Sequence, residues 1–257
     1  MKTGFFMRCA GGCLLTLGLY LSGCAPSYYL TVKPSEAVGA DKYSNGHETL
    51  VADLDSVEMR LSFSHQRDKT LFFEAEVRNG SDQPVLIDPA RFYYEPGITQ
   101  AVASTTGAGY FPARVPAIDP EQQLQLLSTR LTTEDRKATG MSGWEWLTII
   151  GNVTEDATAR KRKETDQERA GRKDQYHSSL QSFDVAREEH GEKAYYTSVE
   201  MELWQRRMLY KYPLQPGELL RGYVVFPIVE QTAQLRVTMP IGPHHFTFDF
   251  DQQRLKY

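Results

Sequence analysis

Apolar and polar residues alternate along two neighbouring stretches of the chain, 57–63 and 71–78. The apolar members are Val57, Met59, Leu61 and Phe63 in the first stretch and Leu71, Phe73, Ala75 and Val77 in the second. A period of two with a polar opposite face predicts half-buried antiparallel strands. Polar residues 65–69 separate the two stretches, so the pattern predicts a β-hairpin. A turn signal at 79–84 then leads into two short predicted strands at 85–88 and 91–94.

The C-terminal part of the chain carries the same signal. Residues 214–218 read Leu-Gln-Pro-Gly-Glu, and a Pro-Gly pair is typical of a type II turn, because proline presets φ and glycine accepts a positive φ. Residues 223–228 are apolar on both faces, which favours a central strand. Alternation returns at 235–241 and 246–250, on either side of Gly242-Pro243. Both Phe73 and Phe248 lie on the apolar face of an alternating strand, so we expect both to be buried.

Helical periodicity replaces alternation between these two β regions. Helices are predicted at 120–138 and 141–151, and a rough apolar stripe that includes Leu124, Leu127 and Leu131 supports the first. A further helix is predicted at 176–203, followed by a strand at 204–212 that re-enters the sheet. Residues 155–174 carry seven basic and six acidic side chains and almost no large apolar one. This segment is either a solvated helix or disordered, because it has little to bury.

Neither β region has enough strands to bury both of its faces alone, so we expect the two halves to form one sandwich. The predicted fold is mainly β with an α insertion: an immunoglobulin-like antiparallel β-sandwich interrupted by a helical segment. In domain terms, the sandwich spans 47–257 and the helical insertion lies at about 120–203. Residues 24–46 mix proline, glycine and serine and are predicted to be a tether, with one short strand at 28–32.

All three cysteines lie at the start of the chain: Cys9, Cys13 and Cys24. Residues 1–23 hold Lys2 and Arg8, an apolar run at 13–21 and the small pair Ser22-Gly23, which is the layout of a secretory signal peptide. An ordinary signal peptide followed by a chance cysteine is one interpretation.

The residues Leu21-Ser22-Gly23-Cys24 resemble the lipobox of bacterial lipoproteins. The resemblance implies that the leader is cut before Cys24, that its thiol is lipidated and that the new amino terminus is acylated, for example with palmitate. Several acyl chains give stable membrane attachment. Residue 25 is Ala25 rather than aspartate, and for such lipoproteins an alanine here implies location in the outer membrane. We expect the protein on the periplasmic side of that membrane.

Charge argues against one class of partner. The whole chain has 29 basic and 33 acidic residues, and removal of Lys2 and Arg8 with the leader leaves 27 basic residues and a net charge of −6. Nucleic acid requires a basic face, so no nucleic-acid partner is expected. The expected partners are the membrane, through the lipid anchor, and an envelope protein or a glycan.

A second resemblance concerns the β regions. The segments EAEVRNGSDQPVLIDPARFYY and YPLQPGELLRGYVVFPI are similar to bacterial immunoglobulin-like lipoprotein domains of the DUF4352 or telokin-like kind. These domains share a turn of the Asn-x-Ser type and a late Pro-Gly-Glu turn before a strand. The resemblance implies the fold and no catalytic residue. The long helical insertion departs from the compact form of that family.

Candidate metal ligands are few. His244 and His245 are neighbours, and neighbours on a strand point to opposite faces, so they would share a metal only in a turn. His177 and His190 have no metal-binding spacing and are interpreted as a solvated helix face. The acidic pair 249 and 251 shares one strand face but has no third acidic ligand nearby. Thus no metal and no cofactor is predicted.

The tryptophans Trp144, Trp146 and Trp204 allow two interpretations. Exposed tryptophan binds sugars or protein partners, whereas tryptophan between helices and a sheet is core, and we expect core. No hydrolase or dinucleotide motif is present, so no catalytic residue is predicted. The expected function is a non-enzymatic binding or scaffolding module of the envelope. The alternative is an envelope enzyme acting on glycan or peptidoglycan, with its site where the helices meet the sheet.

Overall fold

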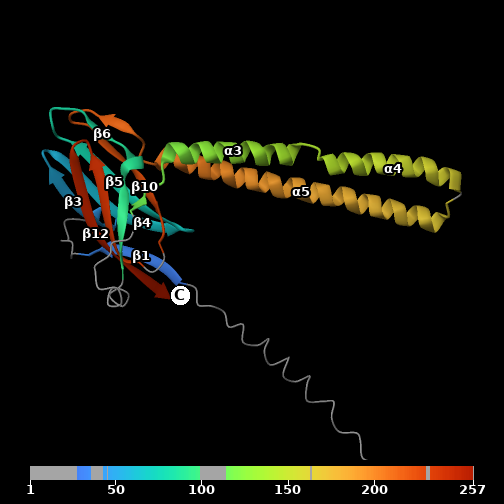
Figure 1. Ribbon diagram of the computed structural model, residues 1–257, viewed down its shortest axis with the longest axis horizontal. Coiled ribbons are helices and arrows are strands. Elements are labelled where there is room, and N and C mark those ends of the chain that lie inside the picture. Colours follow the sequence, from blue (N-terminus) through green and yellow to red (C-terminus); the bar gives the residue numbers. More distant parts are fainter. Residues whose placement is uncertain are drawn as a thin grey trace, which may run out of the picture.

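The protein consists of a β body from which a long helical arm projects (Figure 1). The computed structural model describes residues 28–35, 43–44, 46–98, 114–162, 164–229 and 232–256. The predicted signal peptide and Cys24 lie outside these ranges. Mainly antiparallel sheets with a helical insertion were predicted, and this coarse architecture is confirmed.

The first sheet has five strands in the order β10-β5-β4-β3-β2. Their bounds are Leu219–Pro227, Thr70–Asn79, Val57–Arg67, His47–Leu54 and Tyr43–Ser44. The predicted hairpin is present as β4 and β5, although its turn is shorter than expected because β4 continues to Arg67. Asp68 adopts a φ of 52° in that turn, a conformation that aspartate tolerates better than most residues.

The second sheet has seven strands and contains the path β1-β12-β11-β6-β9, while β7 pairs with both β11 and β8. Their bounds are Tyr28–Pro34 (β1), His244–Lys256 (β12), Thr232–Ile241 (β11), Val85–Ile87 (β6), Tyr212–Leu214 (β9), Tyr93–Ile98 (β7) and Val115–Pro116 (β8). A short 3₁₀ helix, η3 (Pro89–Arg91), connects β6 and β7. The predicted turns at Gly217 and Gly242 are confirmed, with φ of 80° and 55°.

One hydrophobic core joins the inner faces of the two sheets. Phe73 of β5 lies in edge-on contact with Phe250 of β12, with 5.1 Å between ring centroids, and with Phe226 of β10 at 5.8 Å. The Tyr94 hydroxyl of β7 donates to the carbonyl of Pro227 at the end of β10. Burial raises the pKa of Tyr94 to about 12. The predicted burial of Phe73 and Phe248 is confirmed, since they are 0% and 3% exposed.

The arm is an antiparallel helical hairpin. Helices α3 (Pro120–Thr139) and α4 (Gly143–Arg162) follow one another along the single helix α5 (Asp166–Arg207). The 42 residues of α5 extend for about 63 Å. Asp119 caps α3, and Thr165 with Glu168 forms a capping box at the start of α5, which satisfies backbone N–H groups that would otherwise lack partners.

The root of the arm packs on the outer face of the five-stranded sheet. Trp204 of α5 and Leu127 of α3 form a second apolar cluster with Phe72 and Val225, which point outward from β5 and β10. The Tyr210 hydroxyl donates to the carbonyl of Trp204. These contacts fix the base of the arm to the β body.

Three boundary predictions need correction. The short strand predicted at 28–32 is present as β1, but it pairs along its whole length with β12, so the sheet begins at Tyr28 rather than at 47. The predicted strand at 204–212 is wrong over its first part, because α5 continues to Arg207 and only Tyr212–Leu214 forms a strand. Of the two alternatives for 155–174, the structure shows helix at 155–162, the end of α4, and at 166–174, the start of α5.

Within the described ranges, no helix combines the length and apolar character needed to cross a membrane.

Candidate functional site

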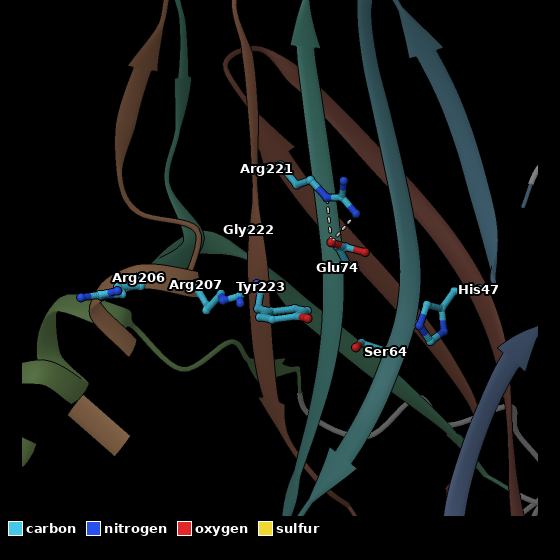
Figure 2. Close-up of a pocket in the computed structure, with 8 residues that line it drawn as sticks. All are labelled: His47, Ser64, Glu74, Arg206, Arg207, Arg221, Gly222 and Tyr223. Carbon is cyan, nitrogen blue, oxygen red and sulfur yellow. Dashed lines mark hydrogen bonds and ion pairs between the residues drawn. The ribbon is translucent and has the colours of Figure 1, made fainter. Parts of the chain in front are cut away.

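A polar depression lies on the outer face of the five-stranded sheet, beside the root of the arm (Figure 2). Its volume is about 510 Å³. The lining residues are His47, Ser64, Glu74, Arg206, Arg207, Arg221, Gly222 and Tyr223. The alternative, enzymatic function was expected to have its site here, where the helices meet the sheet.

Backbone contacts after α5 position the depression. The Leu209 N–H donates to the carbonyl of Tyr223 at 2.9 Å, so the chain leaving the arm runs directly along β10. A Cβ on Gly222 would lie 2.7 Å from the Leu209 nitrogen. Only glycine permits this close approach, and the approach brings Arg206 and Arg207, at the end of α5, to the rim of the depression that Tyr223 also lines (Figure 2).

The charges of the depression are mostly paired. Arg221 binds Glu74 on the neighbouring strand at 2.6 Å, and Arg206 binds Glu202 at 3.2 Å on the solvated helix surface. Among the residues that the structure describes, Arg207 has no ion-pair partner. The depression can therefore accept the negative group of a ligand, although nothing in its geometry selects one ligand.

The depression is lined by one histidine, His47, one hydroxyl, Ser64, and one carboxylate, Glu74, and the carboxylate is already paired with Arg221. The Ser64 hydroxyl lies 3.0 Å from Nδ1 of His65, but the imidazole ring is stacked on Phe72. Burial lowers the pKa of His65, and the stacking accounts for its position without a catalytic role. Two facing carboxylates, or a free carboxylate beside a histidine, would indicate an enzyme.

The metal candidates from the sequence lie apart. His244 pairs with Asp55 at 3.5 Å, whereas Asp249 pairs with Arg236 at 2.8 Å. His190 lies 2.5 Å from Glu134 across the arm, and His177 is exposed. Among the described residues, no group of three or more histidine, cysteine, aspartate or glutamate side chains could hold a metal ion.

A second candidate surface lies on α4. Its exposed apolar residues are Trp144 (76%), Trp146 (55%), Leu147 (59%), Ile150 (50%) and Val153 (63%). The prediction that the tryptophans are core is confirmed for Trp204, which is 4% exposed, and is wrong for Trp144 and Trp146. Exposed tryptophan gathered with aliphatic residues on one helix is typical of a binding surface.

The side of α4 that faces α5 is polar instead. Glu145 is buried and accepts two hydrogen bonds from Arg187 of α5, at 2.7 and 2.8 Å. Farther out, Arg172 of α5 pairs with Asp156 of α4 and, at 3.0 Å, with Glu164. Helix α4 thus places charged groups inside the hairpin beside the buried Ala159, and it leaves most of its large apolar residues in solvent, unlike an ordinary surface helix.

Replacement of Arg187 by alanine should loosen the distal half of the arm, because it leaves the buried carboxylate of Glu145 without its hydrogen-bond donor. We expect backbone amides of α4 to exchange roughly tenfold faster or more, while those of the β body are unchanged. Hydrogen exchange followed by mass spectrometry measures this. The matched control is Arg206→Ala, on the exposed end of α5. Equal exchange of α4 in the wild-type and Arg187→Ala proteins would refute the role given to this pair.

The arm should also lose helix in acid before the β body unfolds. A hydrogen bond from His190 lowers the pKa of Glu134, one from Arg172 lowers that of Glu164, and the Thr165 backbone N–H lowers that of Glu168. A lowered pKa in the folded state stabilises the fold above the ordinary value of 4.5, and this contribution disappears as the pH falls below it. Circular dichroism at 222 nm should therefore decline below that pH while the near-ultraviolet signal of the core aromatics persists. Simultaneous loss of both signals would contradict the prediction.

No family model, no characterised protein and no solved structure matches this chain in the comparisons with known proteins.

Proposed function

We propose that this protein is an outer-membrane lipoprotein that acts as a non-enzymatic binding or scaffolding module of the bacterial envelope. In this proposal its two sheets form an immunoglobulin-like sandwich, Cys24 carries the lipid, and the arm is the element that contacts a partner. The β body then holds the arm at a fixed position on the periplasmic side of the membrane.

The observation that carries the proposal is the exposed apolar surface of α4. Monomeric soluble proteins rarely leave two tryptophans and several aliphatic side chains in solvent on one helix, because each loses the free energy of burial. A partner that covers them accounts for their placement. The fixed root of the arm, built on Trp204 and Phe72, makes the arm a spacer that holds this surface away from the β body.

The short distance between the lipid and the sheet also supports the proposal. Four peptide units separate Cys24 from Tyr28, where β1 begins, and they reach at most about 15 Å even when fully extended. A lipid on Cys24 would therefore hold the β body close to the membrane surface. The arm is several times longer than this tether, so it would be the part of the molecule that reaches other envelope components.

The alternative function, an enzyme acting on glycan or peptidoglycan, has less support. Its expected site at the root of the arm is the polar depression, whose carboxylate Glu74 is occupied by Arg221. We therefore propose a binding function rather than an enzymatic one.

A shortened arm tests the proposal. Ala138 and Gly191 are neighbours across the hairpin, since a Cβ added to Gly191 would lie 3.9 Å from the Cβ of Ala138. Residues 140–189 can thus be replaced by a glycine-rich turn of about four residues, which removes α4 and keeps the contact of Glu134 with His190.

The shortened and the unchanged protein would both be lipidated and purified from solubilised membranes. Quantitative mass spectrometry then compares the proteins bound to each, and a differently tagged version of the chain reports any second copy. We expect bound protein to be enriched with the full arm and lost with the short arm, while the β body melts at the same temperature. Equal binding by the two proteins would overturn the proposal.

A further inference from the structure

We infer that the polar depression at the root of the arm binds a phosphate group that has hydroxyl groups beside it, as in a sugar phosphate or the headgroup of a glycerol phospholipid. Its volume of about 510 Å³ is that of a small-molecule site. The shape of the depression selects no single ligand, but its charge and its hydrogen-bonding groups select this class. The inference goes beyond the proposed function, because the depression lies at the root of the arm and α4 lies in its outer half (Figure 1).

The charge of the depression is opposite to that of the whole chain. It is lined by three arginines, Arg206, Arg207 and Arg221, and by one carboxylate, Glu74. With histidine neutral, its net charge is therefore +2, whereas that of the chain is −4. Glu202, which pairs with Arg206, does not line the depression, and such an exposed pair contributes little. A phosphate monoester has a charge of about −1.5 to −2 at pH 7, so its charge complements that of the depression.

Several hydrogen-bond donors of the depression have no partner among the residues that the structure describes. Arg207 makes neither a side-chain hydrogen bond nor an ion pair. Arg221 directs Nε and Nη2 to a single oxygen of Glu74, at 2.7 and 2.6 Å (Figure 2), which leaves Nη1 for a ligand. The Tyr223 hydroxyl and the imidazole of His47 also lack hydrogen-bond partners. Guanidinium groups bind phosphate oxygens through paired N–H groups, so these donors suit a phosphate better than a neutral molecule.

Other groups of the depression suit the hydroxyls of the same ligand. Tyr223 of β10 lies directly opposite Glu74 of β5 in the sheet, and Ser64 lines the depression from β4. Hydroxyl groups both donate and accept hydrogen bonds, and the second carboxylate oxygen of Glu74 accepts them. A bare phosphate would be repelled by this carboxylate, whereas a ligand hydroxyl can donate to it. The depression therefore suits a phosphate that has hydroxyl groups beside it.

The two sources of the arginines are fixed relative to one another. Met208 forms a parallel bridge with Tyr223, and the Leu209 N–H donates to the carbonyl of Tyr223 at 2.9 Å. These contacts hold the end of α5, with Arg207, against the strand that carries Arg221. Groups that are already in place lose less entropy when a ligand binds. Arginines at the C-terminal end of a helix also stabilise its dipole, but that role does not require a third arginine on a neighbouring strand.

Isothermal titration calorimetry tests the inference on the lipidated full-length chain in a neutral detergent at low ionic strength. One set of probes is glucose 6-phosphate, inorganic phosphate and glucose. A second set, glycerophosphoglycerol and glycerophosphocholine, represents lipid headgroups with and without hydroxyls. We expect glucose 6-phosphate or glycerophosphoglycerol to bind at least about tenfold more tightly than the other members of its set. Tighter binding of the first identifies a sugar phosphate, and tighter binding of the second a lipid headgroup. If neither exceeds its comparison probes, the inference is overturned.

Substitutions then locate the binding. Arg207→Ala should weaken binding of the tighter probe about tenfold, because it removes a charge-assisted hydrogen bond. Arg130→Ala on α3 is the matched control, since Arg130 is also exposed and lacks an ion-pair partner among the described residues, and it should leave binding unchanged. Glu74→Gln should strengthen binding of inorganic phosphate by about threefold or more, because it removes the repelling charge and releases Arg221. Equal effects of Arg207→Ala and Arg130→Ala would place the ligand elsewhere and overturn the inference.

The shortened arm separates this inference from the proposed function. It keeps residues 190–207 and with them the arginines of the depression, so the shortened protein should bind the same probe as tightly as the unchanged one. Phosphate binding without an arm-dependent partner would overturn only the proposed function. An arm-dependent partner without phosphate binding would overturn only this inference. The melting temperature of each variant shows that it is folded.

Discussion

Replacement of Phe73 by alanine is expected to lower the free energy of unfolding by about 3–5 kcal/mol. Phe73 is fully buried at the centre of the core, and its ring contacts Phe63, Phe226 and Phe250 with centroids 5.7, 5.8 and 5.1 Å away. Loss of the ring leaves a cavity between the two sheets that these rigid aromatic neighbours cannot fill. Chemical denaturation of the wild-type and variant proteins measures the difference.

The matched control is Trp144→Ala, which also removes a large aromatic ring. Trp144 is 76% exposed, so its loss should change stability by about 0.5 kcal/mol or less. Phe248→Ala should resemble Phe73→Ala, because Phe248 is 3% exposed on the inner face of β12. Similar unfolding curves for Phe73→Ala and Trp144→Ala would show that the two sheets do not enclose the core as described.

Replacement of Cys24 by serine is expected to abolish lipidation and to stop cleavage of the leader at that site. Only a thiol accepts the lipid at this position, and the other two cysteines, Cys9 and Cys13, precede it in the predicted leader. Metabolic labelling with a radioactive fatty acid measures the first effect, and the mass of the purified chain measures the second. Cys13→Ser is the control and should keep both the label and the cleavage. Label that persists on the Cys24→Ser protein would refute the lipobox assignment.

Strand patterns and turn chemistry made much of the β body predictable. The alternation at 57–63 and 71–78 reports directly which residues face the core, because side chains of a strand point to opposite faces in turn. The Pro-Gly pair at Gly217 likewise specifies its turn, whose positive φ most other residues disfavour. Such local signals do not depend on distant parts of the chain.

Features set by distant contacts were not predictable. A short strand was predicted at 28–32, but its place in the sheet depends on β12, which lies at the other end of the chain. Asn79 was assigned to a turn, yet it is fully buried and donates to the carbonyls of Gln83 and Leu214, 135 positions away. Trp204 begins the strand predicted at 204–212, yet it lies on α5 and packs in one apolar cluster with Phe72 of the sheet.

The candidate binding surface was missed for a related reason. Apolar residues on a helix normally indicate its buried face, so Trp144 and Trp146 were expected in the core. The inner side of α4 is filled instead by Glu145, whose partner Arg187 lies 42 residues away. An acidic residue at 145 and a basic residue at 187 are each compatible with a solvated surface, and nothing in the sequence pairs them.

The central claim is that α4 is the part of the protein that contacts a partner in the envelope. A photoreactive amino acid at position 150, irradiated in living cells that produce the lipidated protein, tests this most directly. The same group at position 86 is the comparison, because Leu86 is 41% exposed on β6 of the β body. The account predicts covalent adducts from position 150 and few or none from position 86. Absence of adducts at 150, or equal adducts from both positions, would contradict it.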